Sequence, residues 1–137
     1  MNEITDEIRR GAKRAAEPRT VAQLPAYRDA SNILYFLTQL TAKTPRKLTR
    51  FSDRILSDAS ELLKCISLAN EFRGEQRAYY LTLALANVSV IKTYVVSLQK
   101  LGIISNKQVD RLKTLLKGLT AQIVAWREFT KSLGSGI

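Results

Sequence analysis

Apolar residues recur along this chain at alternating steps of three and four, in four separate blocks. That spacing places the apolar residues of each block on one face of an α-helix, so it predicts four amphipathic helices. The blocks are joined by short turn signals, and short connections favour antiparallel neighbours. We therefore predict an all-α fold, an up-down-up-down antiparallel four-helix bundle.

Each predicted helix has one stripe of residues that we expect in the core. The helices run from about 25 to 42, 45 to 72, 75 to 101, and from 105 onward. The sustained three-four spacing of the third block outweighs the strand propensity of its valines. The four core stripes, in chain order, are Ala26, Ala30, Ile33, Leu37 and Leu40; Leu48, Ile55, Ala59, Leu62, Ile66 and Ala69; Leu81, Ala84, Val88, Ile91, Val95 and Leu98; and Val109, Leu112, Leu116, Leu119, Ile123 and Trp126.

Turn chemistry marks the helix ends. We expect Thr44 to cap the second helix and Pro45 to be its first residue. Gly74 and Gly102 suit left-handed ends of the second and third helices. The stretch Ser-Asn-Lys-Gln at 105–108 has the spacing of a capping box, in which serine and glutamine each bond the other residue's backbone amide.

With 137 residues, the chain is the size of one domain. We assign residues 23–133 to the bundle, 1–22 to a flexible N-terminal tail and 134–137 to a flexible C-terminus. The first residues mix acidic and basic side chains without an apolar segment, so they resemble neither a secretory signal nor a transit peptide. A single cysteine excludes an intrachain disulfide and fits a reducing compartment, so we expect a cytoplasmic protein.

The third helix carries a second apolar stripe besides its core stripe. A helix that is apolar on two sides needs a second cover, and we expect self-association to provide it. The alternative is that the N-terminal tail wraps this side. We reject a membrane span, because Lys92 lies near the middle of the segment, where a lysine costs about 3 kcal/mol. The second stripe consists of Tyr79, Leu83, Ala86, Val90, Tyr94 and Leu101.

The charge of the chain is strongly positive. Lys and Arg total 22 against 12 Asp and Glu, and the chain has no histidine, so the net charge is +10. Residues 1–20 hold five basic and four acidic residues, which leaves 17 basic and 8 acidic residues for the rest. Such a surplus predicts long-range attraction to a polyanion, which is nucleic acid, an anionic membrane surface or an acidic protein.

Catalytic and metal-binding groups are scarce. Without histidine, a His-based triad, a His-ligated zinc site and a Glu-x-x-His di-iron site are impossible. Cys65 lies one position from the core stripe of the second helix, so we interpret it as a core or boundary residue. Carboxylates such as Asp53 and Asp58 lie at helical spacing from Arg50 and Arg54, as expected for solvated ion pairs. No glycine-rich phosphate loop is present, and we predict no enzyme, no cofactor and no metal site.

The stretch KTPRKLTRFSDR, residues 43–54, has five positive side chains and one carboxylate. Arg46, Arg50 and Arg54 recur every four residues, which places them along one outward face of the second helix. An up-down bundle brings the starts of the second and fourth helices to one pole, so we expect their basic residues to build one patch. The alternative is that these residues form a solvent-exposed charged face that only maintains solubility. The predicted nucleic-acid or partner contacts are Arg46, Lys47, Arg50, Arg54, Arg73, Arg77, Lys107, Arg111, Lys113 and Lys117.

Aromatic residues that could stack on bases are scarce on this face. Phe51 is the only one within the stretch, and Trp126 falls in the fourth core stripe. We therefore expect recognition of the nucleic-acid backbone and shape over base readout. The basic face also lacks the interleaved large apolar residues that an interfacial membrane helix needs.

Three segments resemble a known family. They are AYRDASNILYFLTQL at 26–40, TPRKLTRFSDRILSDASELLKCISLAN at 44–70, and LGIISNKQVDRLKTLLKGLTAQIVAWREF at 101–129. They are similar to the four-helix-bundle proteins that include the accessory variability determinant (Avd) of diversity-generating retroelements and the proteins encoded in ribosomal-RNA intervening sequences. The run GLTAQIVAW at 118–126 resembles the accessory determinant, whereas SLANEFRGE at 67–75 departs from the Asn-Ile-Ala-Glu-Gly stretch of the intervening-sequence branch.

The resemblance implies a ring-like homopentamer of bundles, basic outside, that binds a reverse transcriptase and its template RNA and supports mutagenic complementary-DNA synthesis without catalysis of its own. We accordingly predict a non-catalytic accessory protein that binds a reverse transcriptase and nucleic acid, either RNA or an RNA/DNA hybrid. The alternative is an oligomeric scaffold whose basic surface docks an acidic protein without nucleic acid. Neither hypothesis involves a membrane.

Overall fold

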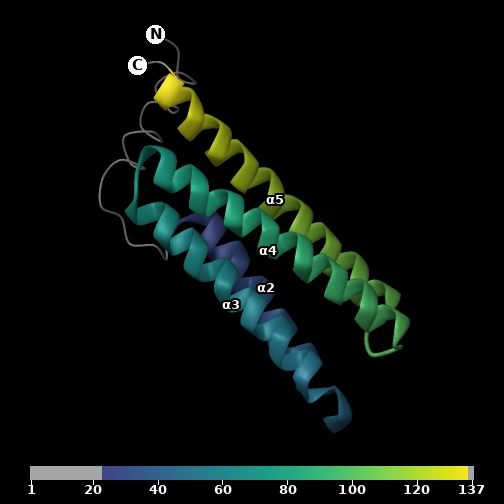
Figure 1. The fold of residues 1–137 in the computed structure, drawn as a ribbon. Coiled ribbons are helices and arrows are strands. Elements are labelled where there is room, and N and C mark those ends of the chain that lie inside the picture. The colour runs from purple at the N-terminus through teal and green to yellow at the C-terminus, as the bar shows by residue number, and fades with distance from the viewer. Residues whose placement is uncertain (1–22, 136–137) are drawn as a thin grey trace.

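A computed structural model describes residues 23–135 of the chain. Within this range the protein is helical and contains no strand, as Figure 1 shows. The predicted tail at residues 1–22 lies outside the described residues, as do 136 and 137. The elements are α2 (Pro25–Thr41), a 3₁₀ turn η2 (Arg46–Leu48), α3 (Thr49–Glu71), α4 (Gly74–Lys100) and α5 (Asn106–Ser135).

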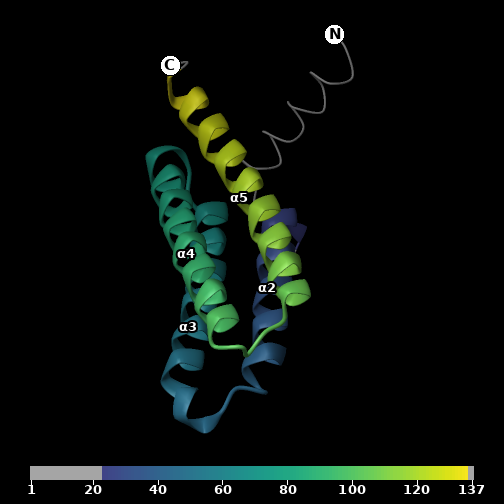
Figure 2. The ribbon, with the colours of Figure 1, turned by 90° about the vertical axis from the view of Figure 1, so that its right-hand side faces the viewer.

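The four α-helices of the described range stand at the corners of an antiparallel bundle. Each helix packs against the one that follows it in the chain, and α5 closes the square by packing against α2. Figure 2 shows α4 and α5 side by side, with α3 and α2 behind them. The α2–α3 and α4–α5 connections lie at the same end of the bundle. This arrangement confirms the predicted four-helix fold and places α3 and α5 at diagonally opposite corners.

The core consists of the predicted stripes. Ala30, Ile33 and Leu37 of α2 are buried, and so is every stripe residue of α4. Two predicted core residues are only half-buried: Leu48, which lies in the 3₁₀ turn before α3, and Trp126, near the end of α5. Because each helix contributes one continuous apolar face, burial against the neighbouring helices stabilises all four together.

Two helix ends follow the predicted turn chemistry. At the start of α5, the Ser105 N–H donates to Gln108 Oε1 at 2.9 Å, and the Gln108 N–H donates to Ser105 Oγ at 3.2 Å. This confirms the capping box. Gly102 follows the C-cap of α4 with a φ of +73°, in the left-handed region that favours glycine, as predicted. Gly74 also has a positive φ, +57°, but it is the first residue of α4 and does not end α3, whose C-cap is the extended residue Phe72.

The start of α3 differs from the prediction. Thr44 does not cap the helix, because its hydroxyl donates to the Leu40 carbonyl at 3.5 Å and so serves the end of α2. Pro45 instead opens the 3₁₀ turn, in which the Leu48 N–H donates to the Pro45 carbonyl at 2.9 Å. The α-helix therefore begins at Thr49, four residues later than expected.

The second stripe of α4 is only partly open to solvent, since Leu83 and Tyr94 are half-buried against the core. Tyr79 is 60% exposed, Val90 43% and Leu101 54%, and Ala86 is exposed as well. The N-terminal tail, the alternative cover, lies outside the described range. By length and composition alone α4 could cross a membrane, a test that core helices also pass, and 33% of its most apolar window is buried in the bundle.

Candidate nucleic-acid interface

The α3 basic row consists of Arg46, Lys47, Arg50 and Arg54, and all four side chains are exposed. Arg50 and Arg54 lie one turn apart on the same face of α3, as the spacing predicts. Arg46 and Lys47 belong to the 3₁₀ turn, which winds more tightly than an α-helix, so they extend the row around the tip of α3. This tip is the lowest part of the ribbon in Figure 2.

The arginines of this row are not neutralised by neighbouring acids. The expected ion pairs between Arg50 and Asp53 and between Arg54 and Asp58 do not form, and none of the described carboxylates pairs with Arg46. An exposed pair at such spacing contributes only about 0.5 kcal/mol, which does not hold two flexible side chains together. The guanidinium groups are therefore available to an external anion.

The four predicted cations of α5 are also exposed: Lys107, Arg111, Lys113 and Lys117. Lys107 and Arg111 are one turn apart on the flank toward α2, since the Arg111 guanidinium carbon lies 5.0 Å from the centroid of the Phe36 ring. Lys113 and Lys117 are one turn apart on a different flank, because two residues advance an α-helix by roughly 200°.

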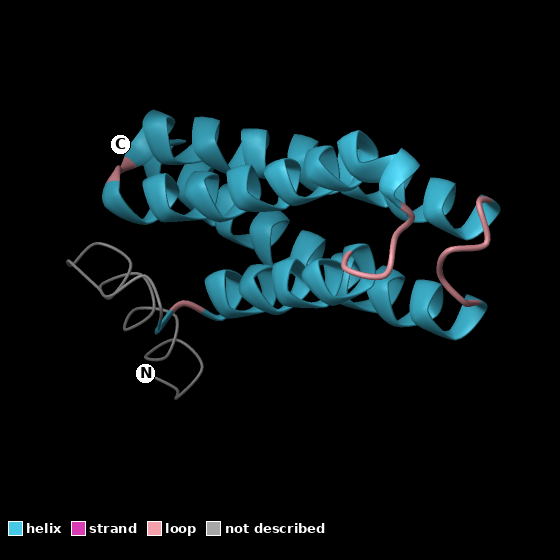
Figure 3. Ribbon diagram, turned by 90° about the horizontal axis from the view of Figure 1, so that it is seen from below, coloured by secondary structure: helices cyan, strands magenta, loops and turns pink. Residues whose placement is uncertain are grey.

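The α3 basic row and the α5 cations share one end of the bundle, not one face along its length. Figure 3 shows the connections that precede α3 and α5 as pink loops at that common end. Away from this end the two helices diverge to opposite corners, with α2 on one side and α4 on the other. A single polyanion could contact both sets only around this end.

Arg77 corrects the predicted site. It is only 5% exposed, so it cannot contact phosphate at the surface. Its Nε donates to the Ala69 carbonyl at 2.7 Å and its Nη2 to the Asn70 carbonyl at 3.3 Å. Its guanidinium carbon also lies 5.4 Å from the centroid of the Trp126 ring. Arg73, by contrast, is exposed, and its Nη1 donates to the Asn70 carbonyl at 3.3 Å.

These contacts have a clear physical cause. The last turn of a helix leaves carbonyl groups without amide partners, and it carries partial negative charge. Arg77 satisfies two such carbonyls of α3 from the start of α4. Burial, followed by repulsion from Arg73, lowers the pKa of Arg77 to about 10, so its guanidinium stays charged at neutral pH.

Cys65 lies in the core, as predicted, with 2% of its surface exposed. The Asn87 amide donates to its sulfur at 3.6 Å. Burial raises the pKa of the Cys65 thiol, and the nearby charge of Glu61 raises it further. The thiol is therefore protonated near neutral pH and is a poor nucleophile. The described residues contain no group of three potential metal-ligating side chains.

The two aromatic residues considered in the sequence are not free platforms. Phe51 is half-buried, and its ring packs edge to face against Tyr94 with centroids 5.2 Å apart. Trp126 is half-buried beneath Arg77. Phe51 is therefore occupied by Tyr94, whereas Trp126 also lines a shallow pocket with Leu24 and Gln122.

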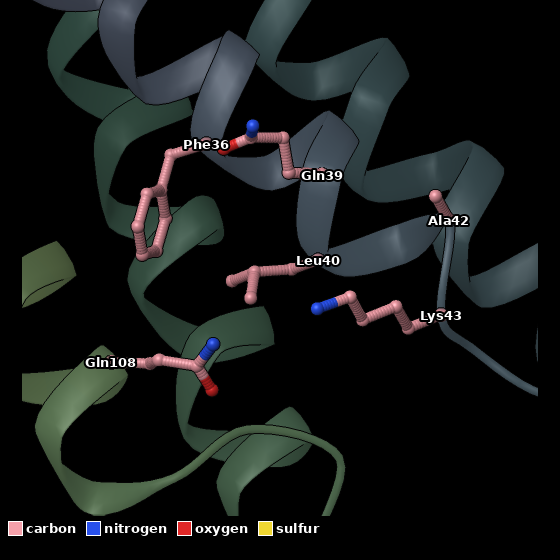
Figure 4. A pocket seen from close by; sticks show the side chains of 6 residues that line it. All are labelled: Phe36, Gln39, Leu40, Ala42, Lys43 and Gln108. Atoms are coloured by element: carbon pink, nitrogen blue, oxygen red, sulfur yellow. The ribbon is translucent and has the colours of Figure 1, made fainter.

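The structure also shows a pocket that the sequence did not reveal. It lies between the end of α2 and the start of α5 and has a volume of about 400 Å³. Figure 4 shows the amine of Lys43 extending over Leu40, with Gln108 facing them from α5. The only sequence signal was Lys43, the first residue of the basic stretch. The α2–α5 pocket is lined by Phe36, Gln39, Leu40, Ala42, Lys43 and Gln108.

Comparison with known proteins does not assign this chain to a family or a function. No protein-family model matches the sequence, and no curated protein matches it.

Proposed function

We propose that this protein is a non-catalytic accessory protein that binds nucleic acid through exposed basic side chains of a rigid helical bundle. One observation carries the proposal: Arg46, Arg50 and Arg54 are exposed and form no ion pair with any described carboxylate. Unpaired guanidinium groups on a chain of net charge +10 attract phosphate strongly, because binding releases condensed counterions.

The contacts suit the backbone of the nucleic acid. Guanidinium groups bind phosphate oxygens in bidentate geometry, and the α3 basic row runs from the 3₁₀ turn into the first turns of α3. A row of exposed cations suits a chain of phosphates, and such contacts fix the position of the nucleic acid without reading its sequence. RNA or an RNA/DNA hybrid fits this mode as well as DNA does.

The proposal extends to assembly and to a protein partner. The exposed part of the second stripe of α4, which includes Tyr79, Val90 and Leu101, supports self-association, since exposed apolar patches mark contacts between proteins. The resemblance to the accessory variability determinant family supports a ring-like homopentamer in the cytoplasm that acts with a reverse transcriptase during mutagenic complementary-DNA synthesis.

A charge-matched pair of variants tests the proposal. Simultaneous replacement of Arg46, Arg50 and Arg54 by alanine should weaken binding to a single-stranded RNA about tenfold or more at 0.1 M salt. The control removes three exposed cations elsewhere, Arg28 on α2, Lys64 on α3 and Lys92 on α4, and should change the affinity far less. Gel shift assays measure both, with circular dichroism as the check on helix content.

Two outcomes would contradict the proposal. Equal weakening by both triple variants would show that net charge alone drives binding. Wild-type protein that binds neither RNA nor DNA, and that carries no nucleic acid when purified at low salt without nuclease, would favour the alternative scaffold that docks an acidic protein.

A further inference from the structure

We propose that the α2–α5 pocket holds one unstacked base of a single-stranded nucleic acid. The inference rests on the proposed function and deepens it. The α3 basic row would contact only phosphates, whereas the pocket would contact a base. A base in this pocket would make the protein discriminate single strands from duplexes.

The floor and wall of the pocket are apolar. Leu40 is buried beneath it, and the half-buried Phe36 ring forms one side. A volume of about 400 Å³ lies within the range of roughly 300–1,000 Å³ typical of small-molecule sites. A flat aromatic group can therefore enter beside the Phe36 ring, over which the Arg111 guanidinium carbon lies 5.0 Å from the centroid, and contact between bases and aromatic side chains is a common element of single-strand binding.

The rim of the pocket offers hydrogen-bonding groups that suit a base edge. Gln39, which is exposed, lines the pocket from α2, and Gln108 lines it from α5. The capping box uses the oxygen of Gln108, which accepts from the Ser105 N–H, and so fixes the orientation of the side chain. The Gln108 amide nitrogen is left to donate, and Figure 4 shows it directed into the pocket between Phe36 and Leu40.

Cations surround the same opening. Lys43 extends over Leu40 from the end of α2 (Figure 4), and Arg111 lies against Phe36. Lys107 is exposed in the first turn of α5, where the helix dipole adds positive potential. An apolar slot edged by amides and by three cations matches a nucleotide unit, which joins a flat base to a phosphate. Bases inside a duplex are stacked and paired, so they cannot enter.

The experiment compares Phe36→Leu, which keeps an apolar side chain but removes the ring, with Tyr35→Ala as the control. Tyr35 is the adjacent residue of α2, is 66% exposed and does not line the pocket. Phe36→Leu should weaken binding of a ten-nucleotide single-stranded RNA about fivefold or more, with an unchanged salt dependence. Binding of a duplex of the same length should not change, and Tyr35→Ala should affect neither.

A second variant tests the pocket even if Phe36→Leu does not fold. Gln39→Ala changes an exposed rim residue, so the fold should persist, and it should also weaken single-strand binding selectively. Equal effects of Phe36→Leu on single strands and duplexes, or no effect of either pocket variant on single strands, would overturn the pocket assignment while leaving the proposed function intact. Wild-type protein that binds no nucleic acid at all would overturn both the pocket assignment and the proposed function.

Discussion

At the level of single residues, a buried guanidinium holds the last turn of α3 against α4 and α5. Arg77 donates to the Ala69 and Asn70 carbonyls and lies over the Trp126 ring. The negative end of the α3 dipole offsets part of the cost of burying this charge. Its position was readable from the sequence, since Arg77 lies four residues before Leu81 and thus in line with the core stripe. The assignment of Arg77 to the nucleic-acid contacts used only its charge, and it was wrong.

Replacement of Arg77 by methionine should lower the free energy of unfolding by about 2 kcal/mol, because the Ala69 carbonyl loses the Arg77 donor and the Asn70 carbonyl keeps only the bond from Arg73. Methionine keeps most of the aliphatic volume, so the loss reports the hydrogen bonds together with the guanidinium contact to the Trp126 ring. Urea denaturation measures it, and Arg54→Ala, an exposed arginine, is the control with an expected change within about 0.5 kcal/mol. Equal losses of unfolding free energy in Arg77→Met and Arg54→Ala would contradict the structural role of Arg77.

Cys65 makes a prediction about pH. Because burial raises the pKa of its thiol, the native chain should form thiolate at higher pH than the unfolded chain does. Alkylation by iodoacetamide should therefore be slower in native protein at pH 8, and its rate should rise with pH at a higher midpoint than in urea. A native midpoint equal to or below the unfolded one would show that the thiol is not buried as described.

At the level of elements, the helices were predictable because each apolar stripe is continuous and its spacing has only one structural solution. The start of α3 was not predictable, since Thr44 could serve either the helix before it or the helix after it. Only the packed structure decides that its hydroxyl donates to Leu40. The α2–α5 pocket was equally hidden, because it depends on where α2 ends relative to the first turn of α5.

Two glycines should respond to alanine in opposite directions. Gly74 has a φ of +57°, so Gly74→Ala should destabilise the fold by about 1 kcal/mol through backbone strain. Gly118 lies within α5 without a positive φ, so Gly118→Ala should stabilise by roughly 0.5–1 kcal/mol. A Cβ at either position meets no atom within 4 Å, so packing does not confuse the comparison. Thermal unfolding measures both, and changes of the same sign would contradict the backbone explanation.

At the level of the whole molecule, the second stripe of α4 and the basic end of the bundle define two separate surfaces. The sequence predicted both from periodicity and charge. It could not predict that the basic residues of α3 and α5 occupy opposite corners, because that depends on the order in which the helices pack. One surface is proposed for copies of the chain and the other for nucleic acid.

Negative charges placed on the second stripe of α4 should dissociate the proposed oligomer into single chains. Replacement of Ala86 and Val90 by glutamate should convert the proposed oligomer to a monomer, because two carboxylates per chain would be buried without partners. Light scattering coupled to gel filtration measures the mass, and Thr114→Glu, on the exposed side of α5, is the control. A wild-type chain that is monomeric at micromolar concentration, or a double variant that stays assembled, would refute this interface.

The salt dependence of RNA affinity tests the central claim most directly. If about six cations contact phosphates, the logarithm of the association constant for a single strand should fall with the logarithm of salt concentration at a slope of about four. With Arg46, Arg50 and Arg54 replaced by alanine, the slope should fall to about two, while the charge-matched variant of Arg28, Lys64 and Lys92 keeps the wild-type slope. Identical slopes in all three proteins would show that the exposed arginines of α3 do not bind nucleic acid.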